Sequence, residues 1–256
     1  MNAGFLSLRG RQTIATEYKG IPEYALPGQH AAIFDIFRKA VPAGAKVLDL
    51  ASGRGAWALR LSDHDYETVA CDIRPDLCMV PCRPVDLNTP FSTQFTPGFD
   101  AVSAIEMLEH VENPRHIARE SKRLLKPHGK LILSTPNASG LHSRVKFLFT
   151  GRFSQFNDEQ YNDIGHIRPL TYWELDKILT EAGFSILSVS FHNHYTLIPR
   201  TVGEIAKLAC SALLRPIVRG VAGGPAIIMV AKKIRELHDG RGGMGIGPRV
   251  TNSSAC

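Results

Sequence analysis

The sequence predicts an α/β protein whose core is a mostly parallel sheet with helices on both faces. Short apolar runs alternate with helical patterns along most of the chain, as they do in β-α-β units. The runs are continuously apolar, which is typical of strands that are buried on both faces. The 256 residues, with 44% hydrophobic and 21% charged side chains, fit one large domain and exclude collagen-like, low-complexity and wholly disordered chains.

The first half of the chain contains five predicted strands. A helix at 56–61 follows the first strand, and a helical pattern from Leu108 to Leu125 follows the fourth. The predicted strands are 46–50, 68–72, 79–82, 100–105 and 130–134.

The regular alternation of predicted strands and helices ends after Asn137, and residues 138–170 are predicted to form a lid. A capping-box pattern at Thr171 and Glu174 then starts another helix. The remaining ranges are a basic and aromatic stretch at 143–156, a polar loop at 157–168, a helix that reaches Ala182, and strands at 184–191 and 226–231.

The longest connection, 199–222, has an amphipathic helical pattern. Apolar residues recur at i, i+3 and i+4 from Val202 to Val221, and cationic residues lie on the opposite face. Pro216 is expected to kink this helix. The pattern suits a membrane interface, packing on the protein's own sheet or a homodimer contact, and does not choose among them. Residues 237–256 are rich in glycine and predict a disordered tail.

The net charge of +6 is unevenly distributed along the chain. Residues 47–137 hold 10 basic and 12 acidic side chains, so the basic surplus lies in the flanking segments. These segments are as aliphatic as they are aromatic, which argues against nucleic acid as a partner. The five cysteines, an odd number, indicate reduced thiols, and we see neither a secretory signal nor an apolar run of about 18 residues. We expect a cytoplasmic protein, with peripheral attachment to the inner face of the membrane as an alternative.

The sharpest local motif, Asp49-Leu-Ala-Ser-Gly-Arg-Gly55, lies between the first strand and the first helix. Its glycines let the backbone approach a ligand closely. Asp72 ends the next strand, where it could accept hydrogen bonds from a ribose diol, and Asp86 with Leu87 could bracket an adenine. An acid four residues before the first glycine suits a cationic, amino-acid-bearing cofactor better than a pyrophosphate.

At these motifs the chain resembles the class I S-adenosylmethionine-dependent methyltransferases, over roughly Gly28 to Lys233. The resemblance implies S-adenosylmethionine as the cofactor and a Rossmann-like sheet of seven strands, mostly parallel, in the order 3-2-1-4-5-7-6 with the last strand antiparallel. The similar stretches, in family order, are Val47 to Gly55, Phe99-Asp100, Glu106 to Val111, Leu124 to Pro127 and Leu133 to Asn137. The implied cofactor-binding residues are Asp49, Ala51, Ser52, Gly53, Gly55, Asp72, Ile73, Asp86, Leu87 and Ile105.

The resemblance also implies a division of the chain. Residues 1–45 would form an N-terminal helical cap that meets the substrate, residues 46–236 the methyltransferase domain, and residues 237–256 the tail. Two positions depart from the family pattern, because Ala51 replaces the usual first glycine of the loop and Arg54 replaces a small residue.

Two carboxylates and an imidazole follow the fourth strand. Glu106, Glu109 and His110 fall at i, i+3 and i+4, which share one face on a helical turn, and they lie at the sheet edge where ligands bind. They could hold a divalent ion, could act as a metal-free general base or substrate clamp, or could be structural charges at a helix end. With the distal His166 they resemble the small-RNA 2′-O-methyltransferases, which implies that these four residues are catalytic and bind Mg²⁺. Other candidates for the acceptor side are Tyr18, Tyr24, His30, Tyr161, His192 and His194.

The resemblance implies methyl transfer to an oxygen of a small-molecule, glycan or lipid-linked acceptor. A similar Glu-Met-Leu-Glu-His-Val stretch occurs in the ubiquinone-biosynthesis O-methyltransferases. One alternative is a metal-dependent RNA 2′-O-methyltransferase, although the chain has no separate RNA-binding module. Another is a catalytically silent, methyltransferase-like binding subunit, for which the departures at Ala51 and Arg54 argue.

Overall fold

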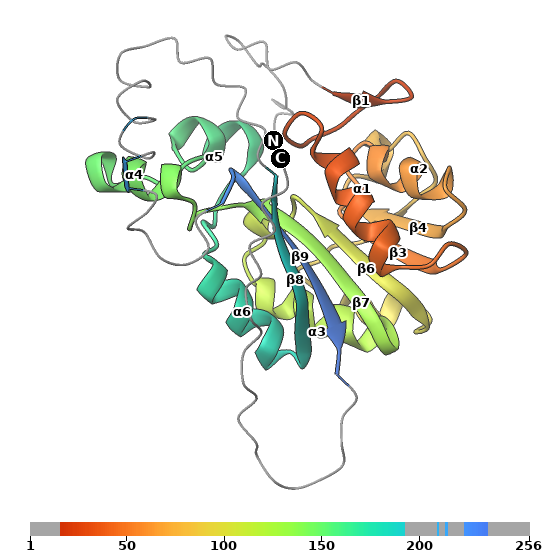
Figure 1. Cartoon of the computed structure of the whole chain (residues 1–256). Coiled ribbons are helices and arrows are strands. Elements are labelled where there is room, and N and C mark those ends of the chain that lie inside the picture. Colours follow the sequence, from red (N-terminus) through yellow and green to blue (C-terminus); the bar gives the residue numbers. More distant parts are fainter. Residues whose placement is uncertain (1–15, 193–208, 210–212, 215–222, 235–256) are drawn as a thin grey trace, which may run out of the picture.

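The computed structural model describes residues 16–192, 209, 213–214 and 223–234, and its centre is a seven-stranded sheet (Figure 1). The strand order β5-β4-β3-β6-β7-β9-β8 is the predicted order when the seven strands are counted along the chain. β9 runs antiparallel to β7 and β8, as predicted for the last strand. The strands are β3 Lys46–Leu50, β4 Glu67–Asp72, β5 Cys82–Pro84, β6 Phe99–Ile105, β7 Leu125–Pro136, β8 Phe184–His192 and β9 Ala226–Lys233.

Helices cover both faces of this sheet. The helices are α1 Gln29–Ala40, α2 Ala56–Ser62, α3 Pro114–Leu124, α4 Leu141–Thr150, α5 Asp158–Ile164 and α6 Tyr172–Glu181. A short hairpin of β1 Glu17–Tyr18 and β2 Ile21–Pro22 precedes α1, so the described part of the N-terminal segment is not purely helical.

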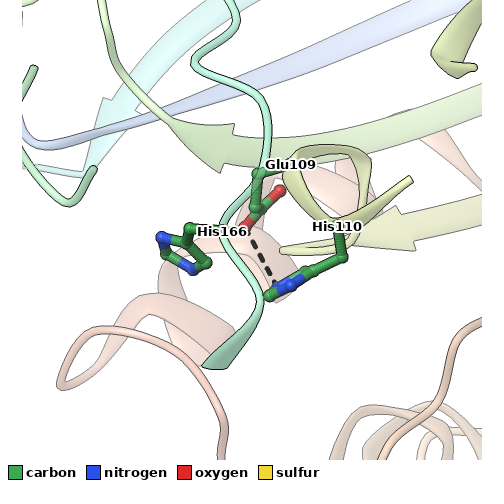
Figure 2. Close-up of side chains that lie close together, drawn as sticks. All are labelled: Glu109, His110 and His166. Carbon is green, nitrogen blue, oxygen red and sulfur yellow. Dashed lines mark ion pairs between the residues drawn. The ribbon is translucent and has the colours of Figure 1, made fainter. Parts of the chain in front are cut away.

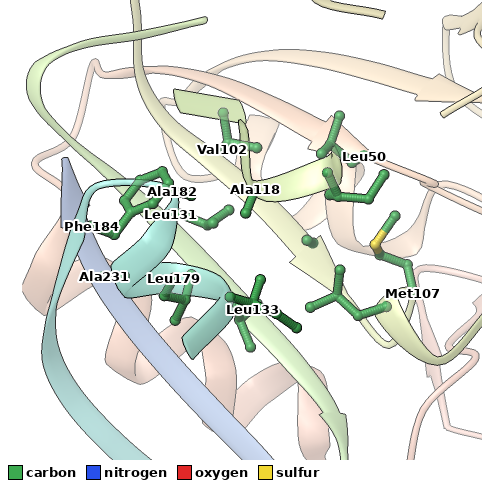
Figure 3. Close-up of a cluster of buried hydrophobic side chains, with 14 of the residues drawn as sticks. Leu50, Val102, Met107, Ala118, Leu131, Leu133, Leu179, Ala182, Phe184 and Ala231 are labelled. Atoms are coloured by element: carbon green, nitrogen blue, oxygen red, sulfur yellow. The ribbon is translucent and has the colours of Figure 1, made fainter. Parts of the chain in front are cut away.

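Two apolar clusters form the core, one on each face of the sheet. In the first, Phe37 of α1 and Trp57 of α2 pack with Val47 of β3. In the second, which includes Leu48, α3 and α6 pack over the opposite face, and Leu179 of α6 and Phe184 of β8 belong to this cluster (Figure 3). Neighbouring residues of a buried strand belong to opposite clusters, because successive side chains point to opposite faces of the sheet. This explains the continuous apolar run of β3.

Helix ends follow from specific capping residues. Thr171 accepts a hydrogen bond of 3.1 Å from the backbone N–H of Glu174, which confirms the predicted start of α6. Asn113 caps α3 in the same way, and Pro114 occupies the first turn of that helix, where its missing N–H is tolerated.

Two predicted elements are corrected. The polar stretch 157–168 is not simply a loop, because α5 occupies part of it. Asn157 caps α5 by accepting from the N–H of Gln160, and Gly165 ends it with a φ of 75°. The strand predicted at 79–82 begins only at Cys82, where it pairs with β4. The apolar residues Met79 and Val80 precede the residues that pair.

The insertion at 199–222 and the tail at 237–256 lie almost entirely outside the described residues. Ala209, Leu213 and Leu214 are described, and they are helical. Among the described residues, no helix is both long enough and apolar enough to cross a membrane.

Candidate active site

The loop after β3 has an unusual backbone. Ala51, Gly53 and Gly55 take positive φ angles of 52°, 55° and 91°. This region favours glycine, yet Ala51 adopts it, so the alanine keeps the left-handed conformation for which a glycine would be the usual residue. At Gly55 a Cβ would lie 2.7 Å from Cγ2 of Val80 and 3.0 Å from Sγ of Cys78, so only glycine fits without movement.

Asp49 lies beneath this loop and is only 2% exposed. Its Oδ1 accepts a hydrogen bond of 2.9 Å from Ser103, while its Oδ2 has no partner among the described residues. Burial raises the pKa of Asp49 to about 7, although hydrogen bonds from Ser52 and Ser103 favour the ionised form. A buried carboxylate oxygen without a donor fits the cationic end of a ligand.

Asp72 ends β4 beside the same loop. Its Oδ2 accepts a hydrogen bond of 2.8 Å from the N–H of Gly53, and its Oδ1 accepts one of 2.8 Å from the N–H of Arg74. The side chain of the next residue, Ile73, is 64% exposed.

The remaining predicted cofactor residues divide into two groups. Asp86 accepts a hydrogen bond of 2.9 Å from the N–H of Asn88 at the surface. Leu87 and Ile105 belong to the two buried clusters, so their side chains contribute to the core.

Glu106 does not lie on the predicted helical turn. Its φ is 48°, and the 3-10 turn occupies only 108–110, so Glu106 shares no helical face with the two residues that were paired with it. Its Oε1 accepts hydrogen bonds of 2.7 Å from Nε2 of Gln29 and 2.7 Å from Oγ of Ser134. Burial raises the pKa of Glu106 to about 7, against the effect of these two donors.

Glu109, His110 and His166 come together (Figure 2). One potential ligand atom of each lies within 4.8 Å of those of the other two, and Nε2 of His110 is 3.9 Å from Oε1 of Glu109. Glu109 is fully buried. Its Oε2 accepts a hydrogen bond of 2.9 Å from Thr135, and its Oε1 has no partner in the described part of the chain. Burial, and then the charge of Glu106, raise the pKa of Glu109 well above its ordinary value.

The two imidazoles are oriented by backbone carbonyls. Nδ1 of His110 lies 3.0 Å from the carbonyl oxygen of Gly165, and Nδ1 of His166 lies 2.8 Å from that of Gln155. Because a carbonyl can only accept, each Nδ1 carries the hydrogen, and the Nε2 lone pair of each neutral ring is available. Burial and the neighbouring His166 lower the pKa of His110 to about 4, and burial also lowers the pKa of His166. Neutral imidazoles held in this way suit metal binding or proton abstraction.

Three residues of this site were not predicted. Ser134 and Thr135 follow the apolar run of β7 at the carboxyl edge of the sheet, and that position could have identified them. Gln29 is 77 residues from its partner Glu106 along the chain, and no local sequence pattern predicts this contact. Among the acceptor-side candidates, His30 packs against Trp57 in the interior, whereas His194 lies outside the described residues.

A sequence profile of the methyltransferase domain family matches residues 26–189, which is more than half of the chain. The chain belongs to the class I S-adenosylmethionine-dependent methyltransferases. A ubiquinone biosynthesis O-methyltransferase of Xylella fastidiosa (strain 9a5c) is 31% identical to this methyltransferase over 212 residues, which cover 74% of the chain and 83% of the relative. One from Xanthomonas oryzae pv. oryzae (strain PXO99A) is 38% identical over 107 residues, which cover 37% of the chain and 44% of that relative. The match therefore spans less than half the length of this second relative.

Solved structures of methyltransferases share the fold. One from Archaeoglobus fulgidus aligns with a TM-score of 0.58 at 19% identity, covering 80% of this methyltransferase and 93% of that chain. A putative methyltransferase from Bacillus halodurans aligns with a TM-score of 0.53 at 20% identity, covering 81% and 100%. S-adenosylmethionine is the cofactor of this methyltransferase.

Proposed function

We propose that the protein transfers the methyl group of S-adenosylmethionine to a hydroxyl oxygen of a small or lipid-linked acceptor. The observation that best supports this proposal is the cluster of Glu109, His110 and His166. Glu109 and His110 follow β6, which pairs with β3 in the sheet, so they stand at the same carboxyl edge as the glycine loop, and His166 joins them from the segment after α5.

On the cofactor side, the chain offers two carboxylates and an open apolar surface. Oδ2 of Asp49 would bind the cationic amino-acid end of the cofactor, and Asp72 would accept hydrogen bonds from the ribose. Ile73 would cover one face of the adenine, with Asp86 at its edge. Together these residues would fix the direction of the sulfonium group, which matters because methyl transfer is an in-line displacement that depends on alignment.

On the acceptor side, His110 and Glu109 would receive the acceptor's hydroxyl group. The low pKa of His110 keeps its Nε2 unprotonated at neutral pH, so this nitrogen can take the hydroxyl proton as the oxygen attacks. His166 would hold the other side of the group. S-adenosylmethionine, held by Asp49 and Asp72, would supply the methyl group and would leave as S-adenosylhomocysteine.

The same three residues also fit a divalent ion. Two imidazole nitrogens and one carboxylate suit Zn²⁺, Mn²⁺ or Fe²⁺ better than Mg²⁺, which prefers oxygen ligands. When bound, such an ion lowers the pKa of a coordinated hydroxyl. Glu106, which was expected to complete the set, is instead hydrogen-bonded to Gln29 and Ser134.

The names of the relatives favour a phenolic acceptor. The test supplies methyl-labelled S-adenosylmethionine with a catechol carrying a long alkyl chain, an alkyl glycoside or a small RNA in separate reactions. We expect label in the catechol, and a loss of about 100-fold or more in Glu109→Gln and His110→Ala. His128→Asn, at an exposed position outside the cluster, serves as the matched control. Label in the RNA alone, or unchanged activity in both site variants, would contradict the proposal.

We further propose that α4 meets the inner face of the cytoplasmic membrane. Its residues Leu148 and Phe149 are 74% and 70% exposed, which gives the end of the helix an apolar surface. Arg144 and Lys146 lie on the same helix, and Arg152, which pairs with Asp158, follows it, so the segment is also cationic. The experiment is co-sedimentation with vesicles containing one-third anionic lipid. We expect Leu148→Asp with Phe149→Asp to abolish binding and to leave cofactor affinity unchanged. Undiminished binding of this double variant would contradict a lipid contact through α4.

A further inference from the structure

Gln29 is a fully buried polar residue at the first position of α1. Both ends of its carboxamide are engaged. Oε1 accepts a hydrogen bond of 2.9 Å from the N–H of Leu26, and Nε2 donates one of 2.7 Å to Oε1 of Glu106. One side chain thus joins the segment that precedes α1 to the carboxylate at the end of β6.

The segment before α1, residues 22–28, lies over the glycine loop. Cδ2 of Tyr24 is 3.5 Å from the position that a Cβ of Gly53 would occupy. Glu23, which is buried, accepts a hydrogen bond of 2.7 Å from Arg60 of α2. At the other end of the segment, Nε2 of His192 lies 2.9 Å from the carbonyl oxygen of Pro27. The segment is therefore attached to α2, to β8 and, through Gln29, to Glu106.

We propose that Gln29 is a positioning residue that couples this segment to Glu106, so that cofactor binding and the orientation of Glu106 depend on each other. The inference rests on the proposed function only in taking the loop at Gly53 as the cofactor's binding site. Replacing Gln29 leaves the N–H of Leu26 and the carboxylate of Glu106 without their shared partner. The segment over the loop and the carboxylate can then move independently.

The test is a double-mutant cycle on cofactor affinity, measured by calorimetry with S-adenosylmethionine. We expect Gln29→Ala and Glu106→Ala each to weaken binding by about tenfold, and the double variant to be no weaker than the weaker single variant. Ile33→Ala, on the buried face of the same helix, should lower the melting temperature yet leave the dissociation constant within about twofold, because it breaks no contact with Glu106.

A spectroscopic signature separates coupling from a merely structural role. The side-chain amide of Gln29 is assigned in a ¹⁵N-correlated NMR spectrum by its disappearance in Gln29→Met, a variant that keeps the volume without either hydrogen bond. We expect this signal to shift in Glu106→Ala and when S-adenosylhomocysteine is added. Additive effects in the cycle, or an amide signal unmoved by the cofactor product, would overturn the proposal. Neither measurement needs an acceptor, so an absence of methyl transfer would refute the proposed function and leave this inference standing.

Discussion

The hydroxyl of Ser103 donates a hydrogen bond of 2.9 Å to Oδ1 of Asp49, between paired positions of the neighbouring strands β6 and β3. Ser103 thus donates to one oxygen of the carboxylate, and the other, Oδ2, has no hydrogen-bond partner among the described residues. A buried carboxylate oxygen without a donor lowers the stability of the free protein, and we propose that a cationic ligand would satisfy it.

Cofactor affinity should depend on pH through Asp49. The free protein holds this carboxyl with a pKa of about 7, and a cationic ligand at Oδ2 would lower it. Binding below pH 7 must then release a proton, so we expect the affinity for S-adenosylmethionine to fall by up to about tenfold for each pH unit between 7 and 5.5. Calorimetry across this pH range measures the affinity for S-adenosylmethionine. Asp49→Asn should bind weakly and with a flat profile, whereas a flat profile in the unaltered protein would rule out this role.

Asp49→Asn should also stabilise the free protein at alkaline pH. Because the folded pKa of Asp49 is raised from 3.8 to about 7, the folded state binds more protons than the unfolded state in that window, and stability is lost as pH rises through it. At pH 8 we expect the variant to gain on the order of 4 kcal/mol in unfolding free energy, a gain that shrinks steadily towards pH 4. Urea unfolding at pH 8 and at pH 5 provides the comparison. Equal effects at the two pH values would show that Asp49 does not carry the raised pKa.

Alanine should be tolerated unequally at the two glycines of the loop. At Gly55 the new Cβ meets Val80 and Cys78 at a φ of 91°, so we expect Gly55→Ala to lose about 2 to 3 kcal/mol of stability. At Gly53 the φ of 55° is the one that Ala51 already adopts, and the nearest neighbour is an ordinary contact with Tyr24 at 3.5 Å. Gly53→Ala should lose only about 1 kcal/mol. Similar losses in urea unfolding would mean that the space at Gly55 is not limiting.

A borderline divalent ion should raise the melting temperature. Zn²⁺ or Mn²⁺ at Glu109, His110 and His166 would bind the folded state alone, and we expect a rise of several degrees at saturating ion. Because the pKa of Glu109 is raised, the ion must displace a proton, and the effect should weaken as pH falls. Glu109→Gln and His166→Ala should remove the rise, and His128→Asn should retain it. A rise that survives both site variants would place the ion elsewhere.

The sheet and the glycine loop could be predicted because their signals are local. A strand buried on both faces is a continuous apolar run, and Asp49, Asp72 and Glu106 follow such runs directly. By contrast, α5 was missed because most of its residues are polar and none of them is buried, so the segment between its Asn157 cap and Gly165 lacks the apolar stripe of a packed helix.

The contacts around Glu106 could not be predicted from the sequence for a different reason. Gln29 and Ser134 reach this carboxylate across separations of 77 and 28 residues. Such hydrogen bonds depend on how the sheet brings the strand ends together. A single sequence does not show which polar side chains then come into contact. The positive φ of Glu106 likewise follows from the path of the chain out of β6.

The placement of β9 between β7 and β8 constrains the order of assembly. β8 is synthesised before β9, yet within this sheet it pairs only with β9. About forty further residues must therefore be synthesised before β8 can form its strand pairing. Until then β7 also exposes an unpaired edge. Completion of the sheet therefore depends on late, long-range pairing, which is the slow part of folding for such topologies and the stage at which the nascent chain is most prone to aggregate.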